Sequence, residues 1–363
     1  MQLEIPCESC GAKLTFNPGT QSLKCQYCDH TMEIQGAEAA AQEAQQEIDL
    51  LAYLDHEEQA EGQVEKHVVH CTGCGAENEL AKDQQASHCP FCDTPIVIAQ
   101  AKTVKKIKPK GLLPFKVERK QAQAAFNAWL SKLWFAPNKL KLQRTQHSAF
   151  EGVYLPYWTY DCDTSSVYSG KRGEHYYVTV QGTSNGKSVS RREQRTRWYP
   201  AQGRVHCLFD DVLVPATQSL PREKLNALEP WDLANLADYK DEYLAGYRSE
   251  TYQVSLKQGY GIAKTIMDHR IRDAIKRDIG GDVQVIHSVN TAYTRATFKH
   301  VLLPVWVSAY RYQEKLYQII VNARTGEVQG ERPWSWVKIT FAALGALALG
   351  GLAFWLYQKQ QGM

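Results

Sequence analysis

The sequence predicts an α+β protein with two small cysteine-rich modules at its N-terminal end and one hydrophobic helix at its C-terminal end. Three observations predict this fold. A four-cysteine motif occurs twice within the first 93 residues, helical and strand-like patterns mix between residues 111 and 335, and residues 339–357 carry no charge. Helices and strands mixed along one region are typical of an α+β body. A chain of 363 residues is long enough for two or three domains with their own cores.

The cysteine motif reads Cys-x2-Cys-x14-Cys-x2-Cys in residues 7–28 and again in residues 71–92. Two thiolates two residues apart can bind one metal ion from a single tight turn, and two such turns supply the four sulfurs of a tetrahedral zinc site. Gly11 and Gly75 follow the second sulfur of each copy, where the backbone must turn. The motif therefore predicts two zinc ribbons, residues 1–36 and 67–100, with one Zn²⁺ each. The predicted ligands are Cys7, Cys10, Cys25 and Cys28 in the first ribbon and Cys71, Cys74, Cys89 and Cys92 in the second.

Iron is the alternative metal, because similar cysteine pairs hold a single redox iron in rubredoxins. A site closed by four sulfurs has no open coordination position, so both ribbons are predicted to be structural or recognition elements. Cys162 and Cys207 have no partner at this spacing and are expected to be packed thiols. The first residues, MQLEIPCESC, lack the basic and apolar regions of a signal peptide. Paired thiols without a secretion signal favour a reducing compartment.

Residues 37–66 are predicted to form an acidic helical spacer, since residues 33–65 hold ten Asp or Glu and no Lys or Arg. Ala, Gln and Glu favour helix. Ile48, Leu51 and Leu54 form an apolar stripe that belongs either to a solvated spacer or to a docking helix. Residues 101–110 contain five Lys. They are predicted to be a basic linker, which can also contact anionic lipid headgroups.

Residues 111–335 are predicted to form one α+β domain. Two helices are expected, over residues 118–135 and 259–281, the second ending at Gly280 and Gly281. Strands are expected over residues 176–198, 283–298 and 301–329. The segments beginning at Phe150 and Phe298 share the pattern Phe-x2-Val-x-Leu-Pro-x-Trp, which is consistent with an internal duplication. The helix over residues 118–135 is expected to bury one face, made of Ala122, Ala125, Phe126, Trp129, Leu130 and Leu133.

The chain is not expected to be an enzyme. GYGIAKT at residue 259 lacks the glycine before Lys264 that a phosphate-binding loop requires. The acidic pairs in DCD at 161 and FDD at 209 could seat a cation, but such pairs are common in loops. The segment at residues 190–198 places Arg191, Arg195 and Arg197 on one face of a strand. These arginines either bind an anion or an acidic partner, or form a solvated face.

The uncharged segment 339–357 is the length of one bilayer crossing, and a transmembrane helix is predicted over residues 338–357. Trp334, Trp336, Trp355 and Tyr357 flank it as an aromatic belt would. Its position predicts a tail anchor, with the bulk of the chain in the cytoplasm. Ala342, Ala346 and Gly350 lie four residues apart and would permit helix pairing in a homo-oligomer.

Taken with the two ribbons, the segments FEGVYLPYWTYD, RTRWYPAQGRV, FDDVLVPA and NARTGEVQGERPWS give the chain a family resemblance. It resembles a family of bacterial membrane-anchored proteins with two zinc ribbons, which is often labelled as related to transcription-factor-type zinc ribbons or to the primosomal helicase. The resemblance implies a place at the bacterial inner membrane beside phage-shock-type or flotillin-like proteins. It implies no catalytic residue, and no helicase core is recognisable in the sequence.

The sequence thus predicts a tail-anchored cytoplasmic adaptor that presents two zinc ribbons at the membrane to recruit protein partners in a membrane-stress response. Nucleic acid is not expected as a partner, because the formal net charge is only +3. The alternative function is a membrane-attached, nucleic-acid-binding zinc-ribbon protein related to replication or transcription, without helicase activity.

Overall fold

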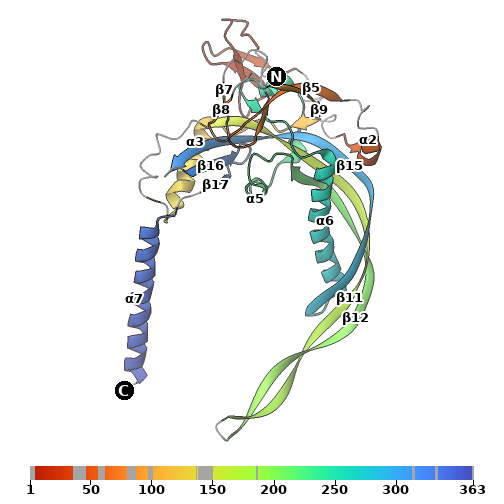
Figure 1. Cartoon of the computed structure of the whole chain (residues 1–363), viewed down its shortest axis with the longest axis vertical. Coiled ribbons are helices and arrows are strands. Elements are labelled where there is room, and N and C mark those ends of the chain that lie inside the picture. The colour runs from red at the N-terminus through yellow and green to blue at the C-terminus, as the bar shows by residue number, and fades with distance from the viewer. Residues whose placement is uncertain are drawn as a thin grey trace.

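The computed structural model describes residues 5–35, 46–55, 62–79, 87–96, 101–135, 137, 150–184, 187–312, 315–331 and 334–361. Over these residues the chain is a mixed α+β protein (Figure 1). The two cysteine clusters lie at the N-terminal end, and one long apolar helix, α7 (Trp336–Gln361), projects from the opposite side of the body. The predicted fold class is therefore confirmed.

A nine-stranded sheet forms the frame of the body. Its three long strands are antiparallel and lie in the order β12 (Lys187–Pro215), β11 (Glu151–Ser184) and β15 (Val283–Tyr312). The shorter strands are β4 (Ile48–Asp49), β10 (Gly111–Leu112), β13 (Ala237–Asp238), β14 (Arg248–Ser249), β16 (Lys315–Asn322) and β17 (Val328–Gly330). The strands β16 and β17, which lie in the region predicted as strand over residues 301–329, pair as an antiparallel hairpin.

The two segments that share the Phe-x2-Val-x-Leu-Pro-x-Trp pattern are direct neighbours in this sheet. They run antiparallel, so that Tyr154 lies opposite Pro304 and Pro156 opposite Leu302. Their apolar side chains alternate between the two faces, because successive residues of a strand point to opposite sides. The shared pattern therefore builds the centre of the sheet from both strands.

Helices cover the sheet. The helix α6 (Leu256–Ile279) begins at Ser255, whose Oγ accepts a hydrogen bond from the N–H of Gln258, and ends at Gly280 with φ 67°. The helix α3 (Arg119–Lys132) packs beside β16 and β17 and buries Ala122, Phe126 and Leu130, as its pattern predicts. Three short elements complete the body: α5 (Arg222–Asn226), η3 (Leu233–Asn235) and η4 (Asp241–Leu244).

Beyond Gly173, the last residue of β11 that pairs with β15, the strands β11 and β12 continue together as a two-stranded ribbon. This ribbon, residues 174–184 and 187–198, is named the arm. It extends away from the body on the same side as α7 (Figure 1). The sequence predicts strands here, but nothing in it indicates a free-standing ribbon.

The first cysteine module holds the sheet of β1 (Leu14–Phe16), β2 (Ser22–Cys25) and β3 (Thr31–Glu33). The second holds the sheet of β5 (Gln63–His70), β6 (Glu77–Glu79) and β9 (Lys102–Ile107), and the pair β7 (Ser87–His88) and β8 (Pro95–Ile96). The segment 101–110, predicted to be a linker, therefore contains a strand. This strand pairs with β5, and Ile107 at its end is buried.

The predicted spacer differs as well. Its described part contains β4 and the short helix α2 (Leu50–Asp55), and the remainder of residues 37–61 lies largely outside the described residues. Ile48 pairs with Phe298 of β15, and this pairing turns Leu50 and Tyr53 toward the sheet. Leu51, which belongs to the predicted stripe, is 61% exposed.

Both modules share cores with the body. Phe16 and Leu23 of the first module pack in one cluster with Tyr154 and Trp306. Ala76 and Phe91 of the second pack with Val153, Leu155 and Leu303. Because Val153, Tyr154 and Leu155 are consecutive in β11, the two modules pack into cores on opposite faces of the sheet.

Candidate metal centres

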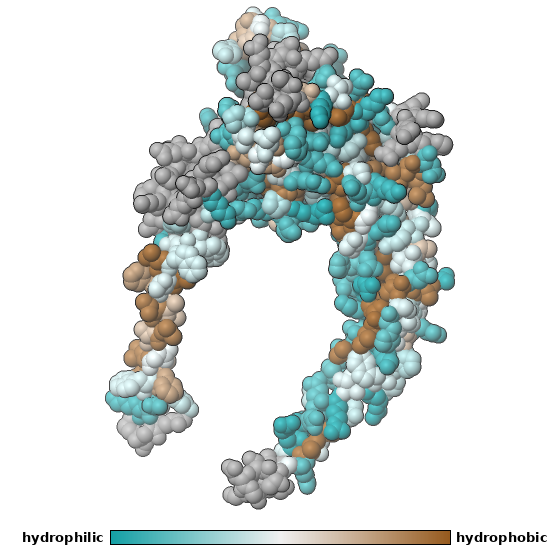
Figure 2. All heavy atoms as spheres, viewed as in Figure 1, coloured by the Kyte–Doolittle hydropathy of each residue, from teal (hydrophilic) through white to brown (hydrophobic). Residues whose placement is uncertain are grey.

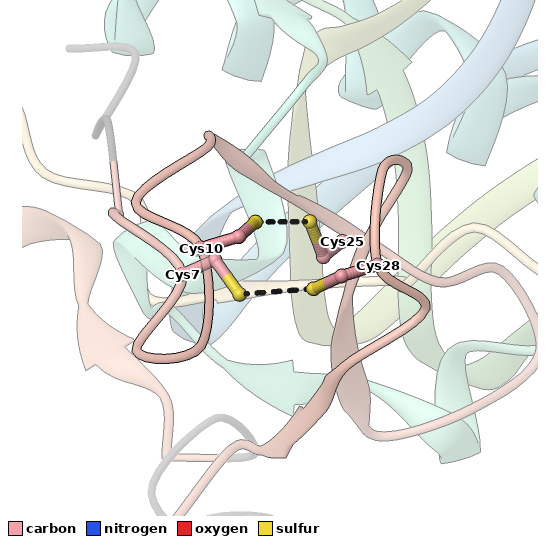
Figure 3. Close-up of side chains that lie close together, drawn as sticks. All are labelled: Cys7, Cys10, Cys25 and Cys28. Carbon is pink, nitrogen blue, oxygen red and sulfur yellow. Dashed lines mark hydrogen bonds between the residues drawn. The ribbon is translucent and has the colours of Figure 1, made fainter.

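Each cysteine module brings its four sulfurs together. The Sγ atoms of Cys7 and Cys28, and those of Cys10 and Cys25, lie 3.6 Å apart (Figure 3). In the second module Cys71 and Cys92, and likewise Cys74 and Cys89, lie 3.5 Å apart. All four sulfurs of each set lie within 4.8 Å of one another. A tetrahedral zinc site with Zn–S bonds of about 2.3 Å needs S–S separations of about 3.8 Å, so both sets fit a metal ion.

The backbone explains how each pair of cysteines converges. The residue after the second cysteine of every pair adopts a positive φ: Gly11 72°, Asp29 58°, Gly75 81° and Asp93 61°. Its N–H donates a hydrogen bond to the carbonyl of the first cysteine, as from Gly11 to Cys7 at 2.8 Å. Glycine and aspartate tolerate this left-handed conformation better than most residues. The repeated Gly and Asp of the motif therefore close four equivalent turns.

Hydrogen bonds within these turns also lower the pKa of a cysteine thiol. The backbone N–H groups of Cys28 and Tyr27 donate to the Cys25 sulfur and lower the pKa of its thiol to about 7. Hydrogen bonds to a thiolate favour the charged form that binds metal. None of the ten cysteines forms a disulfide, so all eight motif sulfurs are free to act as ligands.

The two centres differ in exposure. In the first module Cys10 and Cys28 are exposed, and Tyr27 between its last two cysteines is 85% exposed. In the second module the corresponding aromatic residue, Phe91, is fully buried, and Gln318 of β16 donates a hydrogen bond to its carbonyl oxygen at 2.9 Å. The second centre is thus part of the body core, whereas the first presents one edge to solvent.

The segment after β14 fastens the second module to the body. The N–H of Thr251 donates to the Glu77 carbonyl at 3.1 Å, and Gln253 Nε2 donates to the Gly75 carbonyl at 2.7 Å. Beside them the Glu250 carboxyl is buried, accepts a hydrogen bond from Ser219 Oγ, and has its pKa raised by burial to about 8. A carboxyl held in this way is largely protonated at neutral pH.

A cleft with a volume of about 970 Å³ lies between the two modules. Its walls include β3, which is an edge strand of its sheet, and the strand β5. Lys66 and Lys108 face the ring of Tyr239 at 5.9 and 5.6 Å, and Lys66 pairs with Glu79 at 2.6 Å. Six carboxylates line the cleft against three lysines: Glu8, Glu33, Glu65, Glu79, Asp241 and Glu242 against Lys66, Lys108 and Lys240. This cleft could not be predicted from the sequence, because its lining comes from three separate regions of the chain.

The predicted anion-binding arginines lie elsewhere. Arg191, Arg195 and Arg197 lie on one face of β12, as predicted, but within the arm. The structure therefore does not bring them to the cysteine clusters.

The acidic pairs at 161 and 209 do meet. Asp161 and Asp210 join Glu47 with one oxygen of each within 4.8 Å of the others. The buried Lys299 lies beside them, 2.9 Å from Asp211 and 3.6 Å from Glu47. Lys299 offsets part of the negative charge of these carboxylates, and together the side chains form an ion-pair network of the fold.

The helix α7 carries the properties expected of a membrane span. Within Trp336–Lys359 the most apolar stretch of 18 residues has a mean hydropathy of 2.0, and none of that stretch is buried against the described body. Figure 2 shows hydrophobic residues on its surface, in contrast to the largely polar body. At its start the N–H of Ser335 donates to the Phe135 carbonyl, and Lys338 Nζ donates to the Trp134 carbonyl. The helix is therefore long and apolar enough to cross a membrane once.

Comparison with known proteins adds one relative. No protein-family model matches the chain, and no solved structure matches it. The chain is similar to a protein of Bacillus subtilis (strain 168) with the name Uncharacterized protein YdjG, at 26% identity over 247 aligned positions. The alignment covers 64% of this chain and 66% of that protein. The chain thus spans slightly less than two thirds of its relative's length. The name of this relative states no activity. The two sulfur clusters and the apolar helix of the chain fit a membrane-anchored, metal-binding protein.

Proposed function

We propose that this protein is a single-pass adaptor of the bacterial inner membrane, which is held by α7 and recruits a protein partner through the cleft between two zinc-bound modules. The observation that carries the proposal is the position of this cleft. It lies among the cysteine modules, which stand on the side of the body away from α7 (Figure 1). A partner bound there would sit clear of the membrane surface, in the cytoplasm, where thiols stay reduced.

Zinc has a structural role in this proposal. The four thiolates of each set would bind one ion and cross-link two turns that are distant in the sequence, which stabilises the fold around them. The site is closed by four sulfurs, so the metal would not bind substrate. The adaptor itself has no catalytic role in the proposal.

Metal content tests this part. Purified protein should contain about two zinc ions per chain, measured by mass spectrometry of the metals against protein concentration. Cys10→Ser and Cys74→Ser should each lose one ion, because each removes a ligand from a different set. Iron with a visible charge-transfer band, or one ion shared by both sets, would refute the assignment.

The charge of the cleft supports one kind of partner. Six carboxylates against three lysines favour a segment rich in Lys or Arg. The strand β3 lines the same cleft and, among the described residues, has a strand neighbour on one side only, so its other side could pair with an extended segment. Flotillin-like and phage-shock-type proteins, which the family resemblance implies, are the first candidates.

Charge reversal in the cleft tests the adaptor role. A photo-crosslinker at His67, which is exposed in the cleft, should capture one partner in cells. Glu33→Lys with Glu65→Lys should abolish the capture while the zinc content stays at two ions. The matched control is Glu223→Lys with Asp273→Lys, which reverses two exposed carboxylates outside the cleft. Capture that survives in the Glu33/Glu65 variant would place the partner elsewhere.

A further inference from the structure

The arm is rich in basic residues. Residues 174–198 contain five Lys or Arg and two Glu. Four arginines of β12 are exposed: Arg191, Arg192, Arg195 and Arg197. Only the ion pairs of Arg195 with Glu193 at 3.7 Å, and of Arg172 with Glu174 at the base, are recorded among its described side chains. The arm is therefore a cationic ribbon with most of its charge unbalanced.

Aromatic rings stand between these charges. The guanidinium of Arg192 lies 4.8 Å from the ring of Tyr177, and that of Arg197 lies 5.1 Å from the ring of Tyr176. Tyr177 is 58% exposed and Trp198 42% exposed. Exposed Tyr and Trp rings beside arginines suit the lipid headgroup layer, because Tyr and Trp are enriched there and its phosphates attract cations.

We propose that the arm docks on the headgroups of an anionic phospholipid membrane, the same membrane that holds α7. The proposal rests on the proposed anchoring by α7. Two observations favour lipid over nucleic acid as the partner. The five Lys or Arg and two Glu of the arm give it an excess of three positive charges, as large as the formal net charge of the whole chain, +3. The arm also leaves the body on the same side as α7 (Figure 1). An anchored chain therefore meets lipid phosphates at high local concentration.

The arm must lie on the membrane and not within it. Its strands have no outer neighbours in the sheet beyond Gly173, so their outward N–H and C=O groups would be unpaired in hydrocarbon, as would the arginines. Contact with headgroups therefore requires that α7 stands at an angle to the arm. The recorded hydrogen bonds between α7 and the described body lie at the first turn of the helix, so a change in this angle would leave the body cores intact.

Hydrogen exchange of the full chain in lipid nanodiscs tests the proposal. Every second amide of a two-stranded ribbon points away from its partner and exchanges freely when the ribbon is in water. In nanodiscs with a third of the phosphatidylcholine replaced by phosphatidylglycerol, peptides from residues 174–198 should exchange about tenfold more slowly than in pure phosphatidylcholine. Peptides from α6 should not differ between the two lipids, which provides the internal control.

Variants separate charge from structure. Arg191→Gln, Arg195→Gln and Arg197→Gln together should remove the protection, since each charge near an anionic surface contributes about fivefold to binding. The corresponding lysine variants should retain most of it. The matched control, Lys102→Gln, Lys105→Gln and Lys257→Gln, removes three exposed charges outside the arm and should keep full protection.

Three results would overturn the proposal: equal exchange of the arm in both lipids, protection that survives the triple glutamine variant, or protection in neutral discs on addition of a single-stranded oligonucleotide. The last result would identify the arm as a nucleic-acid contact. Migration of the protein with the discs during gel filtration reports α7 separately. A failed anchor is thereby distinguished from an arm that does not bind lipid.

Discussion

At the scale of single residues, the two copies of the cysteine motif have diverged at the aromatic position between their last two cysteines. Phe91 fills the body core, and Tyr27 points into solvent. Identical metal ligands therefore have different surroundings. The second centre lies within the body core, whereas the first has one edge exposed to solvent.

This difference predicts unequal effects of the same substitution. Phe91→Ala should lower the free energy of unfolding by about 3–5 kcal/mol, because it leaves a cavity in a packed core. Tyr27→Ala should change it by less than about 0.5 kcal/mol, as is usual for an exposed side chain. Denaturant unfolding of the zinc-loaded protein in detergent provides the measurement, and equal losses in both variants would contradict the assigned packing.

Glu250 predicts a pH dependence. Its pKa is about 8 in the folded protein and about 4.3 in an unfolded chain, so the folded state binds the extra proton between these values. Stability therefore falls as pH rises through this window, by up to about 1.4 kcal/mol per pH unit. Glu250→Gln removes the titrating group, and its stability relative to the natural protein should rise from pH 5 to pH 9. Unfolding curves at several pH values test this, with the exposed Glu223→Gln as control; parallel profiles would argue against a buried, protonated carboxyl.

At the scale of elements, α6 shows how closely helix and sheet approach. A Cβ added to Gly259 would lie 2.4 Å from Tyr160 Oη and 2.8 Å from the Trp158 ring. Both rings are fixed, because Tyr160 Oη donates to the Leu256 carbonyl and Trp158 Nε1 donates to the Val254 carbonyl. Neither side chain can move without losing a buried hydrogen bond.

Two glycines of α6 should therefore respond in opposite directions. Gly259→Ala should destabilise the protein by about 1–3 kcal/mol through overpacking. Gly261→Ala, where an added Cβ meets nothing within 4 Å, should stabilise it by up to about 1 kcal/mol through higher helix propensity. Thermal unfolding of the two variants gives the comparison, and destabilisation by both would mean that propensity arguments fail in this helix.

The elements also show what the sequence can predict. The sulfur sets, α3, α6 and the β16–β17 hairpin were predictable, because ligand spacing and apolar period are local signals. The buried face of α2 was not predictable, since it depends on the pairing of Ile48 with Phe298. The strand β9, the cleft and the arm also depend on contacts between distant segments. The arginines at residues 191–197 could be recognised in the sequence. That they project from the body is shown only by the pairing of β11 with β12, which continues to Ser184.

At the scale of the whole molecule, the modules are not independent ends of a chain. From their N-terminal position alone, residues 1–100 would be expected to be removable without unfolding the remainder of the chain. Their side chains instead complete two cores of the body, with Phe16 against Tyr243 and Phe91 beside Leu155. Deletion of these residues would expose apolar surface on both faces of the sheet.

Metal removal tests this coupling without deleting any residue. If the modules and the body unfold as one unit, a chelator should lower the unfolding temperature of the entire described body, because two cross-links within its cores are lost. Hydrogen exchange should accelerate in α6 as well as in residues 71–92. The fold of α7 should not respond, since it lies outside these cores. Cys162→Ser, which removes a buried thiol outside both sets, serves as control and should leave the zinc content and the response to chelator unchanged. Accelerated exchange confined to the cysteine modules would show instead that the ribbons unfold alone, and partner binding could then be studied by truncation.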